Sequence, residues 1–183
     1  MRLFVAIDIP EEIKVRLEAF VDRLRPTAKL SWSPVQNLHV TTKFIGEWPE
    51  SKLGEIEQAL AAVPPRGLVE IGVRGLGWFP NEKSPRVFWA GIEAGESLRK
   101  LAGDTERKLK ELGVPVEDRG FHPHLTLARR RAPTPLENLR QTLAAGETDP
   151  SNHEFGSFQA ASFFLYLSRG GKYTRLREFS LIL

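Results

Sequence analysis

The sequence predicts an α+β protein of two similar lobes, each built from mostly antiparallel sheet with helices on the outside. Two observations lead to this prediction. A His-x-Thr sequence occurs twice within short runs of β-forming residues, at His39 and at His124. The order strand, helix, His-x-Thr strand, helix, strand also occurs twice, shifted by 84 residues from Arg2 to Arg86 and by 85 between the histidines. A motif and an element order repeated at one spacing indicate an internal duplication, and so two lobes related by an approximate two-fold axis.

We expect residues 1–183 to form a single bilobal domain, with repeats over roughly 1–80 and 86–168 and a closing strand over 173–183. A chain of 183 residues is long enough for one substantial domain or for two small lobes that share a core. No apolar run approaches the roughly 20 residues that a membrane helix needs. We therefore expect a cytoplasmic protein without a membrane partner. Because an internal two-fold completes the site within one chain, we also expect a monomer.

The first half alternates between strand and helix patterns. The run Arg2–Asp8 is compact and apolar, as in a buried strand. After Pro10 the apolar residues take a helical spacing, which ends at Pro26. The expected elements are a strand at 2–8, a helix between 10 and 26, a short strand at 30–33, the first His-x-Thr strand reaching residue 45, a helix with its apolar face at 53–63, and a strand at 69–77.

The second half repeats this order. Gly113 is expected to end a helix in a left-handed conformation. The segment Thr134–Glu137 has the form of a capping box with proline at the first helical position. The expected elements are a strand at 86–92, a helix with its apolar face at 98–112, the second His-x-Thr strand, a helix with its apolar face at 136–143, a strand at 153–168 and a closing strand at 173–183.

Each His-x-Thr sequence places an imidazole and a hydroxyl side by side. Successive side chains of a strand point to opposite faces, so His39 shares a face with Thr41, and His124 with Thr126. Two such pairs facing each other would supply two acid–base groups and two hydroxyl donors. One His-x-Thr on a strand is common and carries little information, but a structural histidine has no reason to recur in the same register.

This combination suits the hydrolysis of a cyclic phosphate. Water must attack phosphorus with the help of a general base, while a ring oxygen leaves with the help of a general acid on the opposite side. Histidine serves both roles because its pKa lies near neutrality. The threonine hydroxyls can donate to the non-bridging oxygens, where charge develops. No metal is required, and the absence of cysteine excludes thiolate metal sites and disulfides.

Three basic residues near the motifs are candidates for contacting the phosphate. Lys43 lies two residues beyond Thr41 and so on the same face, although a solvated lysine at a strand end is an equal alternative. Strict alternation from Thr126 would aim Arg130 at the cleft, unless a bulge re-aims Arg129 instead.

The remaining histidines and the aromatic residues have simpler interpretations. His122 and His124 could form an isolated metal pair, but no third ligand accompanies them, so we expect His122 to play a supporting or structural part. His153 is expected at the surface. Five aromatic residues near predicted turns could stack a base, although packing is the better explanation for most of them. These are Trp32, Trp48, Trp78, Phe79 and Tyr173.

Three segments carry a resemblance to a known family: Met1–Pro10, Asn37–Glu47 and Phe121–Arg129. In this order and spacing they resemble the RNA 2′,3′-cyclic phosphodiesterases, also known as 2′-5′ RNA ligases, of the 2H phosphoesterase superfamily, whose fold is LigT-like. The likeness covers nearly the whole chain, and the doubled motif is far more specific than either copy alone. It implies a bilobal fold with the active site in the cleft between the lobes.

The resemblance also implies an activity and the roles of single residues. The activity is hydrolysis of an RNA-terminal 2′,3′-cyclic phosphate to a 2′-phosphate, without metal or cofactor. The resemblance makes His39 the acid towards the departing 3′ oxygen, His124 the base on water, and Arg129 rather than Arg130 a phosphate contact beside Thr41 and Thr126. The same residues run backwards would join RNA ends through a 2′-5′ bond without ATP, with tRNA fragments among the substrates.

Three alternatives remain at this point. The enzyme could cleave small cyclic nucleotides or 2′-5′ linked oligonucleotides with the same residues. The cleft could belong to a non-catalytic nucleotide-binding module, although binding alone does not need two titrating imidazoles. The chain could also be a general RNA-binding domain, for which His39 and His124 would be dispensable.

Overall fold

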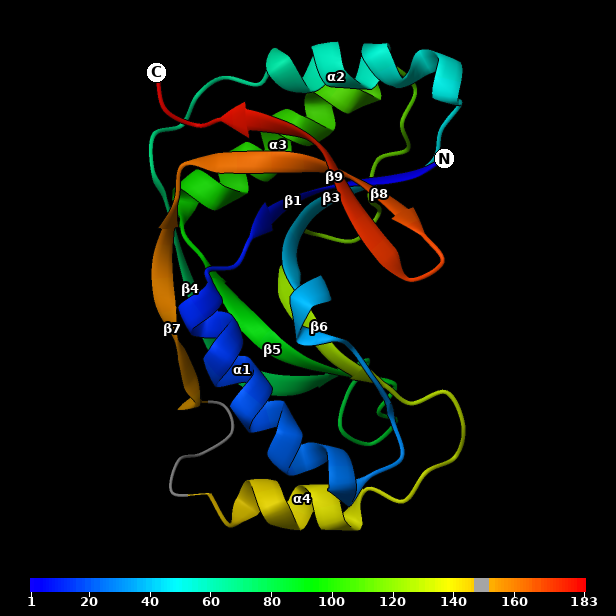
Figure 1. Ribbon diagram of the computed structural model, residues 1–183, viewed down its shortest axis with the longest axis vertical. Helices are drawn as coiled ribbons and strands as arrows, with labels where there is room; N and C mark the ends of the chain where they lie inside the picture. The colour runs from blue at the N-terminus through cyan, green and yellow to red at the C-terminus, as the bar shows by residue number, and fades with distance from the viewer. Residues whose placement is uncertain (147–151) are drawn as a thin grey trace.

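The computed structural model describes residues 1–146 and 152–183, and its strands form two sheets (Figure 1). The first, called here the His39 sheet, has the order β3–β1–β8–β9, and the second, the His124 sheet, has the order β2–β6–β5–β4–β7. Every paired strand is antiparallel to its neighbour. The bounds in the His39 sheet are β1 Arg2–Asp8, β3 His39–Glu47, β8 Ser162–Arg169 and β9 Lys172–Ser180. Those in the His124 sheet are β2 Ser31–Trp32, β4 Val69–Phe79, β5 Val87–Ala94, β6 His124–Arg129 and β7 Glu154–Ala160.

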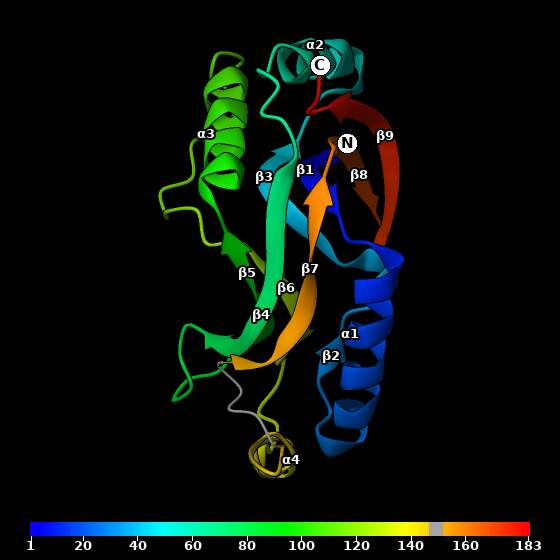
Figure 2. The ribbon, with the colours of Figure 1, turned by 90° about the vertical axis from the view of Figure 1, so that its left-hand side faces the viewer.

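Helices cover each sheet from outside. The helices are α1 (Glu11–Leu24), α2 (Leu53–Ala61), α3 (Glu96–Lys110) and α4 (Glu137–Ala144). The pair α2 and α3 lies at the His39 sheet, where α3 contacts β3, and α1 and α4 lie at the other end of the molecule, where α1 contacts β7 (Figure 1). Seen from the side, α3 and α1 flank the sheets on opposite sides (Figure 2). This arrangement confirms the predicted fold class of two related antiparallel lobes with outer helices.

The two halves of the chain exchange strands. Strand β4 ends the first half but pairs with β5, and β8 comes late in the chain but pairs with β1. The orders β3–β1–β8 and β6–β5–β4 therefore correspond, and each sheet holds strands from both halves. Interleaving of this kind ties the lobes into one unit. The repeat boundaries themselves stay a prediction.

One apolar core runs through both lobes, and a smaller cluster lies on the other face of the His39 sheet. Alternate residues of β1 serve the two clusters: Leu3, Val5 and Ile7 belong to the main core, whereas Phe4 and Ala6 join the smaller one with Phe164 and Tyr166. Burying a leucine or isoleucine side chain contributes about 1.5–3 kcal/mol, so β1 is strongly anchored. Within the described residues, no helix combines the length and apolar character needed to cross a bilayer.

Two local predictions were wrong, and one is confirmed. The stretch 153–168 is not one strand but two, β7 and β8, because its first part pairs with β4 and its second with β1 and β9. The capping box at Thr134 does not form: α4 begins only at Glu137, without a side-chain cap. The Thr134 hydroxyl instead donates to the Ala132 carbonyl at 3.1 Å. Gly113 does end α3 with a positive φ of 87°.

Candidate active site

The strands that carry the two His-x-Thr sequences contact one another across the lobes. His39 begins β3 and His124 begins β6, and these two strands touch. Each motif lies against the first strand of its lobe: His39 is opposite Asp8 and Thr41 opposite Ala6, while in the other lobe His124 is opposite Gly91. The fold thus brings into contact two motif-bearing strands that lie far apart in the sequence.

Both motif strands carry a bulge at the same place. Ala6 pairs with Thr41 and Val5 with Lys43, so Thr42 is an extra residue in β3. The second lobe matches it, since Trp89 pairs with Thr126 and Phe88 with Ala128, which leaves Leu127 as the extra residue of β6. A bulge re-aims the side chains that follow it. The regular alternation of side chains between the two faces of the strand, which the sequence analysis assumed, therefore stops just after each threonine.

The bulges decide which basic residue lies on the motif face. Leu127 and Ala128 are both buried, and Arg129 is the next exposed residue after Thr126. Arg129 thus returns to the face of Thr126 and His124, and its charge acts on the His124 imidazole. Its contact with the phosphate stays a prediction. Arg130 is half-buried and donates from Nη2 to the Thr134 carbonyl at 2.9 Å. Arg130 therefore holds the segment that leads to α4.

The bulge in β3 turns Lys43 into the core. Lys43 is 3% exposed, and its Nζ donates to Glu106 Oε1 at 2.9 Å and to the Pro115 carbonyl at 2.7 Å. The expectation that Lys43 shares a face with Thr41 is wrong for this reason. Thr42 is also buried and donates to the Val5 carbonyl at 3.3 Å, on the side away from the motif.

The two histidines are held in the same way. Nδ1 of His39 donates to the Asn37 carbonyl at 2.9 Å, and Nδ1 of His124 donates to the His122 carbonyl at 2.9 Å. Because a carbonyl only accepts, Nδ1 carries the hydrogen in both rings. The free atom of each ring is therefore Nε2. A neutral ring can take a proton there, and a charged ring can give one.

An aromatic ring packs against each imidazole, again at matching positions. Tyr166 lies 4.6 Å from His39 between ring centroids, and Phe79 lies edge-on to His124 at 4.9 Å. Tyr166 pairs with Phe4 across β8 and β1, as Phe79 pairs with Val87 across β4 and β5. These contacts limit the orientations that either imidazole can adopt.

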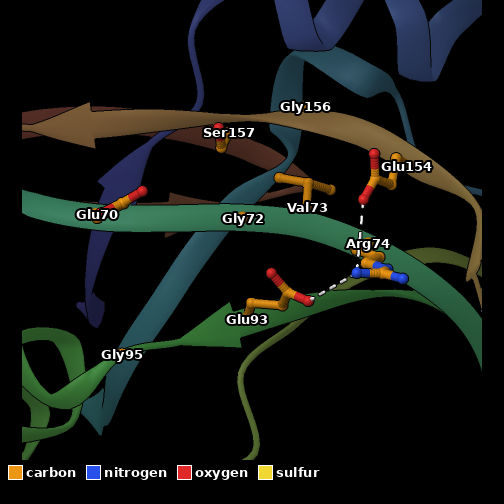
Figure 3. A pocket seen from close by; sticks show the side chains of 9 residues that line it. All are labelled: Glu70, Gly72, Val73, Arg74, Glu93, Gly95, Glu154, Gly156 and Ser157. Carbon is orange, nitrogen blue, oxygen red and sulfur yellow. Dashed lines mark ion pairs between the residues drawn. The ribbon is translucent and has the colours of Figure 1, made fainter.

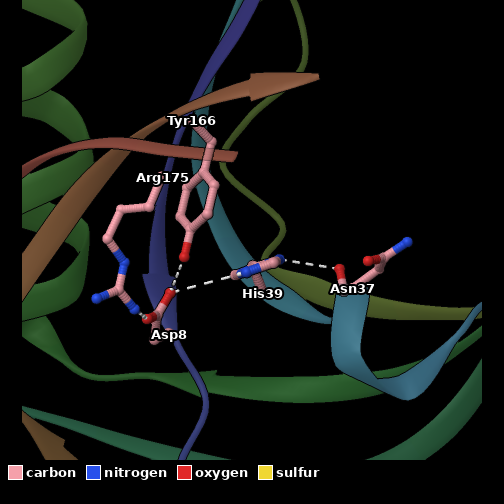
Figure 4. A network of polar contacts seen from close by, with 5 residues as sticks. All are labelled: Asp8, Asn37, His39, Tyr166 and Arg175. Carbon is pink, nitrogen blue, oxygen red and sulfur yellow. Dashed lines mark hydrogen bonds and ion pairs between the residues drawn. The ribbon is translucent and has the colours of Figure 1, made fainter. Parts of the chain in front are cut away.

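A polar network surrounds His39 (Figure 4). Asp8 Oδ1 lies 3.7 Å from His39 Nε2 and accepts a hydrogen bond from the Tyr166 hydroxyl, while Oδ2 accepts from Arg175 Nη2. These residues come from β1, β3, β8 and β9. Motif spacing gave no sign of this network, because Asp8 and Arg175 stand 167 residues apart in the chain.

Burial lowers the pKa of His39 below its ordinary value. The hydrogen bond to the Asn37 carbonyl and the Asp8 carboxylate act in the opposite direction, and the charges of Lys14 and Arg175 lower the pKa further. Burial and its bond to Asp8 also raise the pKa of the Tyr166 hydroxyl, to about 12. Tyr166 is therefore a hydrogen-bond donor at any working pH.

Burial also lowers the pKa of His124. The bond to the His122 carbonyl raises it, but the charges of Arg129 and His122 lower it. Among the described residues, a carboxylate and two cations thus act on His39, whereas only cations act on His124.

His153 and the aromatic candidates lie at the following places. His153 is not simply at the surface, because it packs against Phe20 at 4.7 Å and Phe155 at 4.6 Å. Of the aromatic candidates, Tyr173 is 41% exposed, with its ring 5.9 Å from that of His39. Trp78 is buried, Phe79 packs against His124, and Trp32 and Trp48 are half-buried with indoles that donate to carbonyls.

A pocket of about 430 Å³ lies elsewhere, over β4, β5 and β7 (Figure 3). Its charged lining comprises Glu70, Glu93 and Glu154 around Arg74, which pairs with two of these glutamates at 3.6 and 3.5 Å. Three carboxylates against one guanidinium repel a phosphate, and none of the predicted site residues lines this pocket. Among the residues that the structure describes, no group of three or more His, Cys, Asp or Glu is placed to hold a metal ion.

Comparison with protein families matches residues 11–173 to the 2′-5′ RNA ligase superfamily. The chain belongs to this superfamily. It is 34% identical over 185 residues to an RNA 2′,3′-cyclic phosphodiesterase of Archaeoglobus fulgidus, with 98% of this chain and 99% of the relative covered. It is 38% identical over 146 residues to the Thermus thermophilus protein of that name, with 74% and 71% covered. The family expected from the sequence is thereby confirmed.

Two solved structures share the fold over nearly the whole chain. The crystal structure of the Thermus thermophilus protein TT0787 superposes with a TM-score of 0.79 at 33% identity, covering 99% of this chain and 98% of that one. E. coli LigT complexed with 3′-AMP gives 0.75 at 25% identity, covering 98% and 97%. The superfamily member described here thus has the complete bilobal LigT-like architecture.

Proposed function

We propose that this protein opens RNA-terminal 2′,3′-cyclic phosphates, with His39 and His124 as the acid–base pair and without a metal ion. The observation that carries the proposal is the matched state of the two histidines: each donates from Nδ1 to the carbonyl two residues earlier and keeps Nε2 free. Two reactive nitrogens held alike on contacting strands suit a reaction that needs one base and one acid. The relatives named RNA 2′,3′-cyclic phosphodiesterase support the substrate class.

The reaction proceeds in line at phosphorus. Nε2 of His124 takes a proton from water as the water oxygen bonds to phosphorus, and Nε2–H of His39 gives a proton to the 3′ oxygen as its bond to phosphorus breaks. The product is a 2′-phosphate with a free 3′-hydroxyl. Thr41, Thr126 and Arg129 are assigned to the non-bridging oxygens, where negative charge develops.

The joining of RNA ends is the same reaction with a different nucleophile. A 5′-hydroxyl attacks phosphorus in place of water and gives its proton to His124, while His39 gives a proton to the 3′ oxygen as its bond to phosphorus breaks. This would form a 2′-5′ linkage without ATP, on substrates such as tRNA fragments. Membership of the 2′-5′ RNA ligase superfamily supports this second reaction, which requires no residues beyond those named above.

The decisive experiment uses the full chain in EDTA with a short RNA that ends in a 2′,3′-cyclic phosphate. The position of the product phosphate is determined for the wild type, His39→Ala and His124→Ala. A 2′-phosphate that requires both histidines is expected. A 3′-phosphate would reverse the leaving oxygen and overturn the two roles. Loss of activity in EDTA that returns with a divalent metal would overturn the metal-free mechanism.

Two parallel assays separate the alternatives. If a small 2′,3′-cyclic nucleotide or a 2′-5′ dinucleotide is cleaved and the RNA end is not, the substrate class is wrong although the mechanism stands. If the protein binds these molecules but turns over none, it is a binding module. A mixture of RNA ends with 2′,3′-cyclic phosphate and 5′-hydroxyl, without ATP, tests joining.

A further inference from the structure

The two halves of the active site differ at the pair of equivalent positions that lie opposite the two histidines. Asp8 lies opposite His39 on β1, and the residue in the same relation to His124 on β5 is Gly91. Around Nδ1 the two histidines are held alike, as described above. The difference therefore falls on the side of Nε2, the atom that transfers the proton.

The second half of the site leaves no room for a side chain at this position. A Cβ atom on Gly91 would lie 2.4 Å from the Arg74 carbonyl oxygen, a backbone atom that cannot move aside easily. The lobe of His124 thus excludes a counterpart of Asp8. This lobe carries a charged residue, Arg129, which stands at a different position. Arg129 pairs with Val87, just as Phe44 pairs with Phe4 in the lobe of His39, so Arg129 and Phe44 are equivalent.

Asp8 is held at a distance that suits an electrostatic role. Its Oδ1 lies 3.7 Å from His39 Nε2, beyond the usual range for a hydrogen bond, so Nε2–H stays available for substrate. Its oxygens are occupied by Tyr166 and Arg175. The carboxylate is therefore fixed near the imidazole without blocking it.

We infer that Asp8 is a positioning residue that makes His39, rather than His124, the proton donor of the proposed reaction. The carboxylate favours the imidazolium form of His39, while Arg129 disfavours a charge on His124. An internally duplicated site would otherwise offer two interchangeable histidines. The pair Asp8 and Gly91 removes that symmetry and sets the direction of proton flow, so that the 3′ oxygen leaves. This inference rests on the proposed function.

The charges that face His39 come from several elements. Asp8 on β1 raises its pKa, whereas Lys14 on α1 and Arg175 on β9 lower it, each by less than Asp8 raises it. Arg175 thus has two effects, since it also fixes Asp8. Removal of the Asp8 charge should expose His39 to the two cations alone.

The first test is an NMR titration of the imidazole signals in the full chain. In Asp8→Asn the pKa of His39 should fall by about one unit, while that of His124 stays constant. The matched control is Glu47→Gln, which removes a carboxylate at the opposite end of the β1–β3 ladder and should move neither. An unchanged His39, or an equal shift of both histidines, would overturn the inference whether or not RNA is a substrate.

The second test is kinetic and identifies the step. One unit in pKa corresponds to about tenfold less protonated His39 at pH 7, so kcat of Asp8→Asn should fall about tenfold with KM nearly unchanged. A substrate with sulfur at the 3′ bridging position has a leaving group that needs no proton. On this substrate the deficit of Asp8→Asn should vanish, and a persistent deficit would contradict an action through the acid.

A third comparison guards against a variant that is merely misfolded. Asp8→Glu keeps the charge and should restore most of the His39 pKa, although its longer side chain disturbs the bonds to Tyr166 and Arg175. If Asp8→Glu behaves like Asp8→Asn in both the titration and the kinetics, the charge is not the cause. If the wild type itself opens no cyclic phosphate, the proposed function fails while the titration still tests the coupling of Asp8 to His39.

Discussion

Tyr166 and Phe79 occupy equivalent positions in the two lobes, and each packs against the histidine of its own lobe. The ring distances are 4.6 Å to His39 and 4.9 Å to His124. The two differ by one hydroxyl, and that hydroxyl donates to Asp8. The chemical difference between the two histidines is thus built from residues that surround an otherwise symmetric pair.

Tyr166→Phe should weaken the hold on Asp8 without removing its charge. A hydrogen bond to a charged group in a partly exposed site contributes roughly 1–2 kcal/mol, so the free energy of unfolding should fall by about 1 kcal/mol in urea titration. The kcat should fall only a few-fold, less than in Asp8→Asn. The matched change Phe79→Tyr adds a hydroxyl in the other lobe and should leave the His39 pKa unchanged. A larger kinetic loss in Tyr166→Phe than in Asp8→Asn would contradict this order.

Arg129 and its neighbour Arg130 should give opposite results. Arg129→Ala removes an exposed cation from the face of His124. Loss of one hydrogen-bond donor to a developing charge typically lowers the rate about 10²–10³-fold. We therefore expect kcat/KM to fall about 100-fold, with the free energy of unfolding unchanged. Arg130→Ala removes the bond to the Thr134 carbonyl and should lower the free energy of unfolding by about 1 kcal/mol with kcat/KM retained. Thermal unfolding and initial rates are measured for both variants. If the two outcomes are exchanged, Arg130 rather than Arg129 contacts the phosphate.

Lys43→Met should destabilise the fold and spare the chemistry. It leaves Glu106 in a partly buried site without its cation, and breaking a buried pair costs about 3–5 kcal/mol, less here because the Glu106 side chain is 31% exposed. We expect a loss of about 2 kcal/mol, with kcat and KM unchanged at a temperature where the variant is folded. Lys52→Met, at an exposed position, is the control. A selective rise in KM for RNA would show a role in binding.

This loss should depend on pH. Burial raises the pKa of Glu106, but hydrogen bonds from the Glu117 amide and from Lys43, together with the charges of Lys43 and Lys110, lower it overall. A carboxyl with a lowered pKa stabilises the fold above the pKa of the unfolded chain, about 4.3, and loses this contribution as the pH falls through the folded value. The difference between wild type and Lys43→Met should therefore shrink below about pH 4.

The rate should follow a bell-shaped dependence on pH that lies on the acid side of neutrality. In the proposed mechanism His124 accepts a proton in its neutral form, so activity should fall below its pKa. His39 donates a proton in its charged form, so activity should fall above its pKa. Burial lowers both pKa values from about 6.5. The kcat/KM profile of the free enzyme should show both limbs, and only the alkaline limb should move to lower pH in Asp8→Asn. Movement of the acid limb instead would reverse the two roles.

Tyr173 is expected to stack a base of the RNA. Its ring packs edge-on against Phe4 at 5.0 Å and is 41% exposed close to His39. Stacking of a base on an aromatic residue contributes about 1–3 kcal/mol, so Tyr173→Ala should raise KM for RNA at least about fivefold with kcat retained. A cyclic phosphate on an abasic ribose is the control, because its KM should not change. Equal effects on both substrates would indicate a disturbed site.

The fold class, the family and the two His-x-Thr sequences could be predicted without the structure. These depend on local patterns: strand and helix periods are visible in short windows, and the repeated motif can be recognised wherever its strands lie in space. The resemblance also selected Arg129 over Arg130. Alternation of side chains along the strand could not identify Arg129, because it assumes a strand without a bulge.

Features that depend on pairing between distant segments could be seen only in the folded protein. The bulges at Thr42 and Leu127 follow from the register of β3 on β1 and of β6 on β5, and they turn Lys43 inward and Arg129 outward. The division of 153–168 into two strands follows from its separate partners. Asp8 meets His39 and Arg175 only when β1 lies between β3 and β8, and no spacing in the chain encodes that contact.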